Sequence, residues 1–425
     1  MEKQKGIAKI TKAAAEVREW RKWYYERINN AKDYSEFVAL SMLGVPDEIL
    51  RSFGVWSSLA ENYGPLCAAK RVSDIFCEAA EEDGFSIDLC SYLKIGIGYL
   101  KRSRDLGKIP PEAPYGGMGK IDMVIGPAGF CDGRMQYPLA ALRYVNVPFF
   151  DYDTQDLPWW KIDKETKKYY IEYAYGRFKE LVAFLAKVTD KKYDENRLSE
   201  ALDLWMKSHK LFNQAAQLRK HHPNPLSSID SFAVCFPNLH FKGTKECVDF
   251  YQRLYDEVKS MTDKGRGAVA EEKYRIYWFG LPPWQYFGAF DYLQSHGFSV
   301  IDTTYDAGDV PEDVDVNNPL YAIAKKYYDG VWFGSGLSRR HNFEERIRER
   351  CSMYDIDGII TLIGTTCRAN TLQIFHRKII NERLNLPVLN LDIDMTDVRS
   401  FSEADVKGKL DSFMEAVEVS KKRGR

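Results

Sequence analysis

Hydrophobic and polar positions change their period several times along the chain. Near both ends, short runs of β-branched and aromatic residues are separated by stretches whose apolar residues recur at helical spacing. Strands that alternate with helices predict parallel βαβ units. We expect a first set of strands at 36–40, 121–126 and 147–150, with helices near 66–83 and 88–101, and a second set of strands at 274–279, 298–302, 358–363 and 387–391.

The middle of the chain has a long helical period instead. Apolar residues keep helical spacing from about 165 to 222, where Pro223 and Pro225 stop the helix, and another helix is expected at about 243–263. Residues 1–32 form an amphipathic helical pattern that we expect to pack on the chain's own domain, with a partner-binding helix as the alternative. The fold class predicted is α/β, with two Rossmann- or flavodoxin-like lobes with parallel sheets plus a helical segment. The predicted parts are an N-terminal helix (1–34), a first lobe (35–165), a helical segment (166–268) and a second lobe (269–425).

Length and composition exclude several classes of function. A chain of 425 residues is too long for one ordinary domain. Its 60 basic and 61 acidic residues give a net charge of −1, which argues against nucleic-acid binding through bulk positive charge. No apolar stretch is long enough to span a membrane, and the charged N-terminus lacks the apolar centre of a secretory signal. We therefore expect a cytoplasmic protein whose cysteines stay reduced.

Glycine-rich loops are candidate phosphate sites, because nucleotide enzymes are common among α/β proteins. The loop at 114–120 has Pro114 where the first glycine of a phosphate-cradling loop should stand, and Ile121 where serine or threonine should follow the lysine. Gly96 and Gly98 lack a third glycine at the required offset, so turn glycines are the simpler interpretation. The sequence predicts that this chain does not itself hydrolyse ATP.

Three of the eight cysteines stand out by their context. Cys131 and Cys367 each follow a predicted strand and a short loop, and Cys90 follows Ser86 and Asp88, which are expected to start the helix predicted near 88–101. Parallel sheets place ligands beyond the carboxyl ends of their strands, where helix N-termini also favour thiolates. Three thiolates from both lobes would suit an iron–sulfur cube with one iron left open. On placement alone, ordinary buried thiols remain the commoner explanation.

Seven local motifs point to one family. They are ENYGPLCAAK (61–70), GFSIDLC (84–90), EKYRI (272–276), GLPPW (280–284), DG (357–358), TC (366–367) and a D-x-x-D-x-R stretch (394–399). Together they resemble motifs of the 2-hydroxyacyl-CoA dehydratases and the ATP-dependent (class I) benzoyl-CoA reductases, and the similarity covers residues 35–418.

The resemblance implies one [4Fe-4S] cluster held by Cys90, Cys131 and Cys367, although Cys131 matches only by its placement. It also implies a homologous second iron–sulfur subunit, a separate ATP-hydrolysing iron–sulfur activator and a CoA thioester substrate. Cys67 and Cys77 could join an enlarged cluster or be core thiols. The chemistry shared by the family is a one-electron reduction of the thioester at low potential.

The resemblance leaves the reaction open. The segment at 243–258 favours the larger subunit of a benzoyl-CoA reductase, which is our main expectation, whereas 68–70 and 86–90 match (R)-2-hydroxyacyl-CoA dehydratases equally well. Trp284 and Phe287 are candidates for the wall of an acyl pocket or for core residues. His222 is a candidate proton donor, with an exposed helix end as the alternative. A non-catalytic small-molecule-binding α/β protein is the remaining hypothesis.

Overall fold

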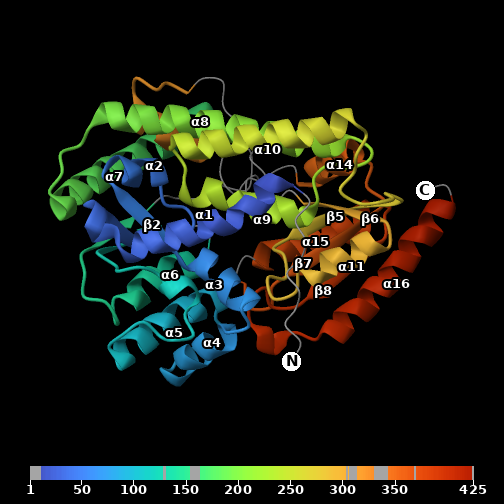
Figure 1. Cartoon of the computed structure of the whole chain (residues 1–425), viewed down its shortest axis with the longest axis horizontal. Helices are drawn as coiled ribbons and strands as arrows, with labels where there is room; N and C mark the ends of the chain where they lie inside the picture. The colour runs from blue at the N-terminus through green and yellow to red at the C-terminus, as the bar shows by residue number, and fades with distance from the viewer. Residues whose placement is uncertain are drawn as a thin grey trace.

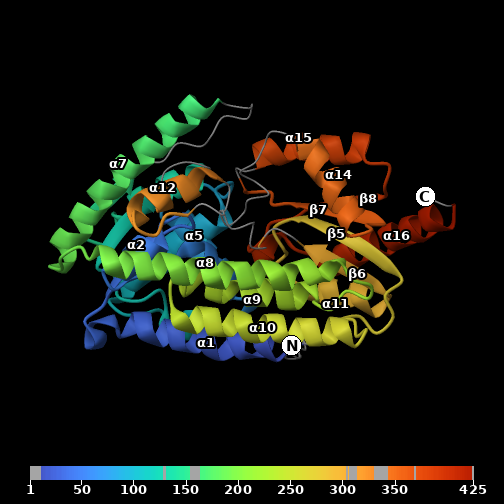
Figure 2. The same cartoon turned by 90° about the horizontal axis from the view of Figure 1, so that it is seen from above.

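The fold is that of a computed structural model, which describes residues 11–127, 131–153, 163–302, 305, 314–329, 343–367 and 370–423. Its two four-stranded sheets lie on opposite sides of the molecule (Figure 1), and long helices run across both (Figure 2). Within these residues, no helix combines the length and apolar character needed to cross a bilayer. The predicted α/β architecture with two lobes is confirmed.

The first sheet is parallel, with the order β2-β1-β3-β4. The first two strands consist almost wholly of buried residues, as expected for a parallel sheet with both faces covered. The strands of this sheet are β1 (Phe37–Ser41), β2 (Val55–Leu59), β3 (Met123–Pro127) and β4 (Phe149–Tyr152). Its helices are α2 (Asp47–Ser52), α3 (Ala60–Ala69), α4 (Ser73–Glu82), α5 (Ser91–Leu106) and α6 (Asp132–Ala141).

The second sheet repeats this topology with the order β6-β5-β7-β8, also parallel. In each sheet the first and third strands of the lobe are neighbours in the middle. The strands are β5 (Tyr274–Gly280), β6 (Phe298–Asp302), β7 (Gly358–Ile363) and β8 (Val388–Asp392). The helices in this part of the chain are α11 (Gly288–Ser295), α12 (Pro319–Asp329), α14 (Phe343–Met353), α15 (Asn370–Arg383) and α16 (Glu403–Lys422).

Helices from the middle of the chain and its N-terminus join the lobes. They are α1 (Lys12–Asn29), α7 (Lys164–Thr189), α8 (Glu195–Gln217), α9 (Ser228–His240) and α10 (Lys245–Asp263). Side-chain oxygens cap the first backbone N–H groups of all five, from Thr11, Asp163, Asp194, Ser227 and Thr244. Helix α1 packs on α9 and α10, so the expectation that it packs on its own chain is confirmed. Short 3-10 turns occur at Ala31–Tyr34, Pro114–Gly116, Leu218–Lys220 and Val398–Ser400.

Two elements connect the lobes in ways that chain order does not suggest. Helix α9 supplies residues to a first-lobe core through Val234 and Phe236, and to a second-lobe core through Ile229 and Phe232. Helix α12 follows β6 in sequence, but it packs on α7 and α8 and belongs to a first-lobe core. The relative placement of the lobes therefore rests on shared apolar cores.

The glycines considered as phosphate residues have other uses. Gly96 and Gly98 lie inside α5 rather than in a turn. A Cβ at Gly98 would lie 1.8 Å from the carbonyl oxygen of Phe76 in α4, so glycine permits the close approach of these helices. Gly117 and Gly119 have positive φ angles of 91° and 83°, as the turn interpretation expects.

Candidate functional site

Cys131 and Cys367 occupy equivalent positions in the two lobes. Cys131 follows β3, and Cys367 follows β7, the third strand of its own lobe. Each therefore lies beyond the carboxyl end of a middle strand, next to the point where the strand order reverses. Ligands bind at such points in open parallel sheets.

Cys90 reaches the same place from a helix rather than a strand. Helix α5 begins at Ser91, three residues later than predicted, and Cys90 itself occupies the N-cap position, where Ser86 and Asp88 were expected to start the helix. Cys131 is likewise the N-cap residue of α6, and Cys367 lies three residues before α15. The N-termini of α5 and α6, with their partial positive charge, thus lie at Cys90 and Cys131.

The three thiols come together between the lobes. Burial raises the pKa of the Cys90 thiol well above its usual value, and Cys367 and Cys131 raise it further through their charges. A Cβ placed on Gly133 would lie 3.7 Å from the Cys131 sulfur and 3.9 Å from the Cys90 Cβ. All three residues are half-buried. The structure therefore brings together the three cysteines that the sequence singled out.

The spacing of the three thiols indicates whether they would hold a single metal ion or a cluster. Among the described residues, no three His, Cys, Asp or Glu side chains are spaced to hold one metal ion. A cubane cluster instead spreads its thiolate ligands over different irons, so it needs a wider set of sulfurs. Three cysteine thiols, two of them at helix N-termini, fit that donor set.

Backbone and hydroxyl groups link the loops that carry two of these cysteines. The Ser91 N–H donates to the Thr366 hydroxyl oxygen at 3.2 Å, and the Thr366 hydroxyl donates to Asp394. Ser91 follows Cys90 and Thr366 precedes Cys367, so this contact crosses from one lobe to the other. Asp394 is 1% exposed.

Basic residues beside the thiols are neutralised by carboxylates. Arg134, one turn after Cys131, pairs with Glu61 at 3.5 Å, and both side chains are largely buried. Lys94, one turn after Cys90, pairs with Glu81 at 2.9 Å and donates to the Ile87 carbonyl at 2.7 Å. The local charge is therefore balanced rather than positive.

Trp284, in the loop after β5, is linked to the Cys90 segment through Tyr92, which follows Cys90 by two residues. Its indole N–H donates to the Tyr92 hydroxyl at 2.7 Å, across the lobe boundary. Burial raises the pKa of Tyr92 well above its usual value, and the charges of Tyr305, Cys90 and Cys367 raise it further. Phe287 packs against Trp284 with a centroid distance of 5.4 Å, and Phe232 contacts both rings. Both predicted pocket residues thus belong to an aromatic cluster that contacts Tyr92, the residue whose pKa the charges of Cys90 and Cys367 affect.

His222 lies at the other end of the second sheet. Its ring nitrogens contact Asp355 at 2.8 Å and Glu272 at 3.2 Å, residues that precede β7 and β5. Cys367 follows β7, a strand of six residues. At a rise of about 3.3 Å per residue, the strand separates the two sites by roughly 20 Å. The structure does not bring His222 to the cysteines.

Cys67 and Cys77 lie in the first-lobe core. Both are 0% exposed, and burial raises the pKa of each thiol above its usual value, with the neighbouring Cys77 raising that of Cys67 further. Their helices α3 and α4 pack against each other and against α5. This environment is that of core thiols.

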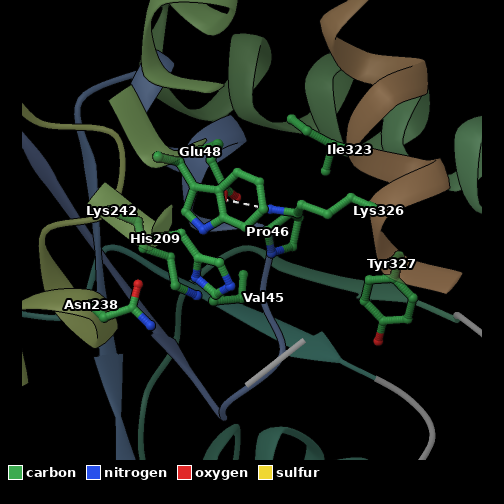
Figure 3. A pocket seen from close by; sticks show the side chains of 10 residues that line it. Val45, Pro46, Glu48, His209, Asn238, Lys242, Ile323, Lys326 and Tyr327 are labelled. Carbon is green, nitrogen blue, oxygen red and sulfur yellow. Dashed lines mark hydrogen bonds and ion pairs between the residues drawn. The ribbon is translucent and has the colours of Figure 1, made fainter. Parts of the chain in front are cut away.

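A narrow cavity lies beside the loop after β1 (Figure 3). This loop is at the carboxyl ends of the first sheet's strands, as Cys131 is. Lys326 of α12 reaches Glu48 of α2 at 2.6 Å, with its ammonium 4.0 Å from the centre of the Trp205 ring. Both charged side chains are buried. The other lining residues are Val45, Pro46, His209, Asn238, Lys242, Ile323 and Tyr327. The ion pair fixes α12 to the first lobe.

Sequence reasoning assigned no role to Tyr92, Asp394 or the Glu61–Arg134 pair. Asp394 and Glu61 lie inside segments quoted for the family resemblance, and Tyr92 follows Cys90 by two residues. Their spatial relation to the thiols depends on contacts between lobes, which no local pattern records.

Comparison with known proteins gives the family. The model for the 2-hydroxyglutaryl-CoA dehydratase D-component matches residues 42–417. The (R)-phenyllactyl-CoA dehydratase alpha subunit of Clostridium sporogenes is 26% identical over 398 residues, 92% of each chain. The (R)-2-hydroxyisocaproyl-CoA dehydratase alpha subunit of Clostridioides difficile is 24% identical, over 94% of this chain and 95% of that subunit.

A reductase relative also aligns. A subunit of the benzoyl-CoA reductase of Thauera aromatica is 24% identical, over 93% of this chain and 92% of that subunit. The expectation of an enzyme is confirmed, since these relatives are parts of enzymes. The family match and the first relatives favour dehydration, the alternative that the sequence left open, over the ring reduction that we expected first. This chain belongs to the 2-hydroxyglutaryl-CoA dehydratase D-component family.

Proposed function

We propose that the chain is the cluster-binding subunit of an (R)-2-hydroxyacyl-CoA dehydratase, with Cys90, Cys131 and Cys367 as ligands of one [4Fe-4S] cluster. The observation that carries the proposal is the convergence of these three thiols from two lobes. The family match and the dehydratase relatives support the substrate class, a 2-hydroxyacyl thioester of coenzyme A. The overall reaction removes the hydroxyl from C2 and a hydrogen from C3, which leaves an enoyl thioester and water.

The chain's own residues prepare the site for an electron-transfer group. When bound, the cluster would supply a single electron at low potential to the thioester. The ion pairs Arg134–Glu61 and Lys94–Glu81 neutralise the cations beside the thiols, and balanced charge keeps a reduction potential low. The amides at the starts of α5 and α6 stabilise thiolate charge once the protons have left.

Aromatic residues next to the thiols would shield and orient the acyl group. Trp284, Phe287 and Phe232 pack edge to face or tilted, which excludes water from that side. Tyr92 accepts from the Trp284 N–H, and its raised pKa means that it keeps its own proton. Its hydroxyl can therefore donate a hydrogen bond to an oxygen of the substrate.

Partner proteins form part of the proposal. The relatives are named as subunits, which supports a homologous second subunit here. The loop at 114–120 lacks the residues of a phosphate-binding loop. We therefore infer that a separate ATP-hydrolysing iron–sulfur activator delivers the electron.

Iron analysis tests the ligand assignment. The chain is purified anaerobically, reconstituted with iron and sulfide, and compared with Cys90→Ser, Cys131→Ser and Cys367→Ser. Each substitution should lower the iron bound per chain and alter the visible absorption and electron paramagnetic resonance spectra. Cys351→Ser in α14 is the matched control and should bind iron as the unaltered chain does. Equal amounts of bound iron in all variants would refute the assignment of these three cysteines as cluster ligands.

A second candidate function is reduction of an aromatic acyl thioester, favoured by the aromatic cluster at Trp284 and by the reductase relative. Electron counting separates the two reactions. Ring reduction consumes two electrons per product, whereas dehydration returns its electron and continues. With both partners present and reductant limiting, we expect enoyl-CoA far in excess of the electrons added. Formation of one product molecule for every two electrons added would establish the reductase instead.

A further inference from the structure

The D-x-x-D-x-R stretch at 394–399 lies between the two lobes and contributes Asp394 to the contact that links the Cys90 and Cys367 loops. Asp394 follows β8, and its Oδ1 accepts from the backbone N–H groups of Thr396 at 2.8 Å and Asp397 at 2.7 Å. These bonds fix the turn from within. Its second oxygen, Oδ2, remains to accept from the Thr366 hydroxyl.

The direction of that hydroxyl matters for the contact between lobes. A threonine hydroxyl has one proton and two lone pairs. Because Thr366 donates its proton to Asp394, its lone pairs are directed toward the Ser91 N–H, which donates at 3.2 Å. Without the carboxylate, the hydroxyl could rotate and lose this acceptor geometry. The Asp394–Thr366–Ser91 chain thus joins the residue before Cys367 to the residue after Cys90.

The turn at 394–397 makes further contacts that also link the two lobes. The Thr396 hydroxyl donates to the Ser91 hydroxyl at 2.6 Å, a second bond to the start of α5. The Gln285 amide donates to the Asp394 carbonyl at 2.6 Å, and the Trp284 backbone N–H donates to the Met395 carbonyl at 3.0 Å. One turn therefore holds the α5 start and the loop after β5, while its carboxylate holds the Cys367 turn.

The rest of the stretch ties the turn to α4 and α5. Arg399 donates to Glu81 at 2.6 Å and to Asp397 at 2.7 Å, and Lys94 lies between Glu81 and Asp397, 2.9 and 3.7 Å from them. Lys94 also holds the Ile87 carbonyl in the loop before Cys90. Side chains on both sides of the lobe boundary are thus linked by charge-assisted bonds, which are stronger than neutral ones.

We propose that Asp394 is a positioning residue that sets the spacing between Cys90 and Cys367 by orienting the Thr366 hydroxyl toward Ser91. It acts through Thr366 and through the turn at 394–397, and it is not itself a ligand. The proposal rests on the proposed function only for the use of these thiols, because the contacts themselves are made by the chain's own residues.

Thiol bridging in the iron-free full-length chain tests the spacing directly. Dibromobimane links nearby thiols, and mass spectrometry measures the yield of the Cys90–Cys367 bridge. In Asp394→Asn and Thr366→Val we expect the bridging rate to fall about fivefold, the population change expected from a net loss of one hydrogen bond. Thr366→Ser keeps the hydroxyl and should bridge like the unaltered chain. Equal rates in all four proteins, or an equal loss in Thr366→Ser, would overturn the proposal.

A second measurement distinguishes positioning from simple destabilisation. After reconstitution, the midpoint potential of the bound cluster is measured by spectroscopic titration. Asp394→Asn and Thr366→Val should shift the potential relative to the unaltered chain, and Thr366→Ser should not. An unchanged potential in both variants would contradict the proposal even if less cluster were bound. A chain that binds no cluster in any form would refute the proposed function, while the bridging result would still decide the role of Asp394.

Discussion

Replacing Gly98 by alanine should force helices α4 and α5 apart, and the structure gives the size of the displacement. The new Cβ would lie 1.8 Å from the Phe76 carbonyl oxygen and 2.6 Å from its carbonyl carbon. Both are backbone atoms inside α4, so no side-chain rotation relieves the overlap. Restoring an ordinary contact of 3.4 Å from 1.8 Å requires a movement of 1.6 Å.

The substitution changes the free energy of unfolding through opposing effects. Overpacking of a well-packed core costs about 1–3 kcal/mol, sometimes more. Separation also removes dispersion contacts of buried residues such as Phe76, which is 0% exposed. Alanine gains about 0.5–1 kcal/mol over glycine in a helix interior. The lost dispersion contacts place the overpacking cost at the upper end of its range, so after the helical gain we expect Gly98→Ala to lower the free energy of unfolding by about 2 kcal/mol.

Urea denaturation with a matched glycine measures this effect. Gly408 lies in α16, and a Cβ placed on it would have nothing within 4 Å, so Gly408→Ala should raise stability by about 0.5–1 kcal/mol. Hydrogen exchange should place the loss in Gly98→Ala within α4 and α5, which matters because two lobes need not unfold together. If Gly98→Ala is as stable as Gly408→Ala, the close approach of these helices is not as described.

Two further substitutions test charged groups. Lys326→Met leaves the Glu48 carboxylate, 1% exposed, without its paired cation, so the free energy of unfolding should fall by about 3–5 kcal/mol. In urea denaturation, adding Glu48→Gln should recover much of this loss, and the absence of any recovery would contradict the pairing. Hydrogen bonds from Arg399, with help from Lys94, lower the pKa of Glu81 from 4.5 to about 2. Because this folded-state pKa lies below the unfolded one, the stability that Glu81 adds is present above about pH 4.5 and disappears toward pH 2. The difference in melting temperature between the unaltered chain and Glu81→Gln should shrink over that interval, whereas a difference independent of pH would contradict the assignment.

Sequence patterns locate most of the strands because these runs are apolar and bounded by turns. All four second-lobe strands lie within one residue of their predicted limits. Strand β2 escapes prediction because VWSSL contains two serines and no alternation. In the structure these serines are buried and satisfied, since Ser57 donates to Asp47 at 2.6 Å and Ser58 to the Met118 carbonyl at 2.7 Å. Such compensation involves residues distant in sequence, so a local pattern cannot record it.

Helix α9 escapes prediction for a different reason. Almost every residue of Ser228–His240 is buried, because the helix packs on both lobes, so the segment lacks the polar face that reveals an amphipathic helix. Pro237 within the helix and the preceding prolines also indicate a loop. The single helix predicted at 66–83 is wrong, because two helices, α3 and α4, occupy this region with a break at Lys70–Val72. Boundaries of this kind depend on tertiary packing more than on periodicity.

The candidate site combines a predictable part with one that the sequence does not reveal. Cys131 and Cys367 follow the third strand of sheets with the same order, so strand-end reasoning finds both. That reasoning cannot say that the two strand ends face each other, nor that Cys90, which follows no strand, completes the set. Their approach depends on α9, shared between cores, and on the turn at Asp394. Substitutions in these connecting elements should therefore alter the thiol spacing without touching a cysteine, and the sequence around each cysteine would give no warning of the change.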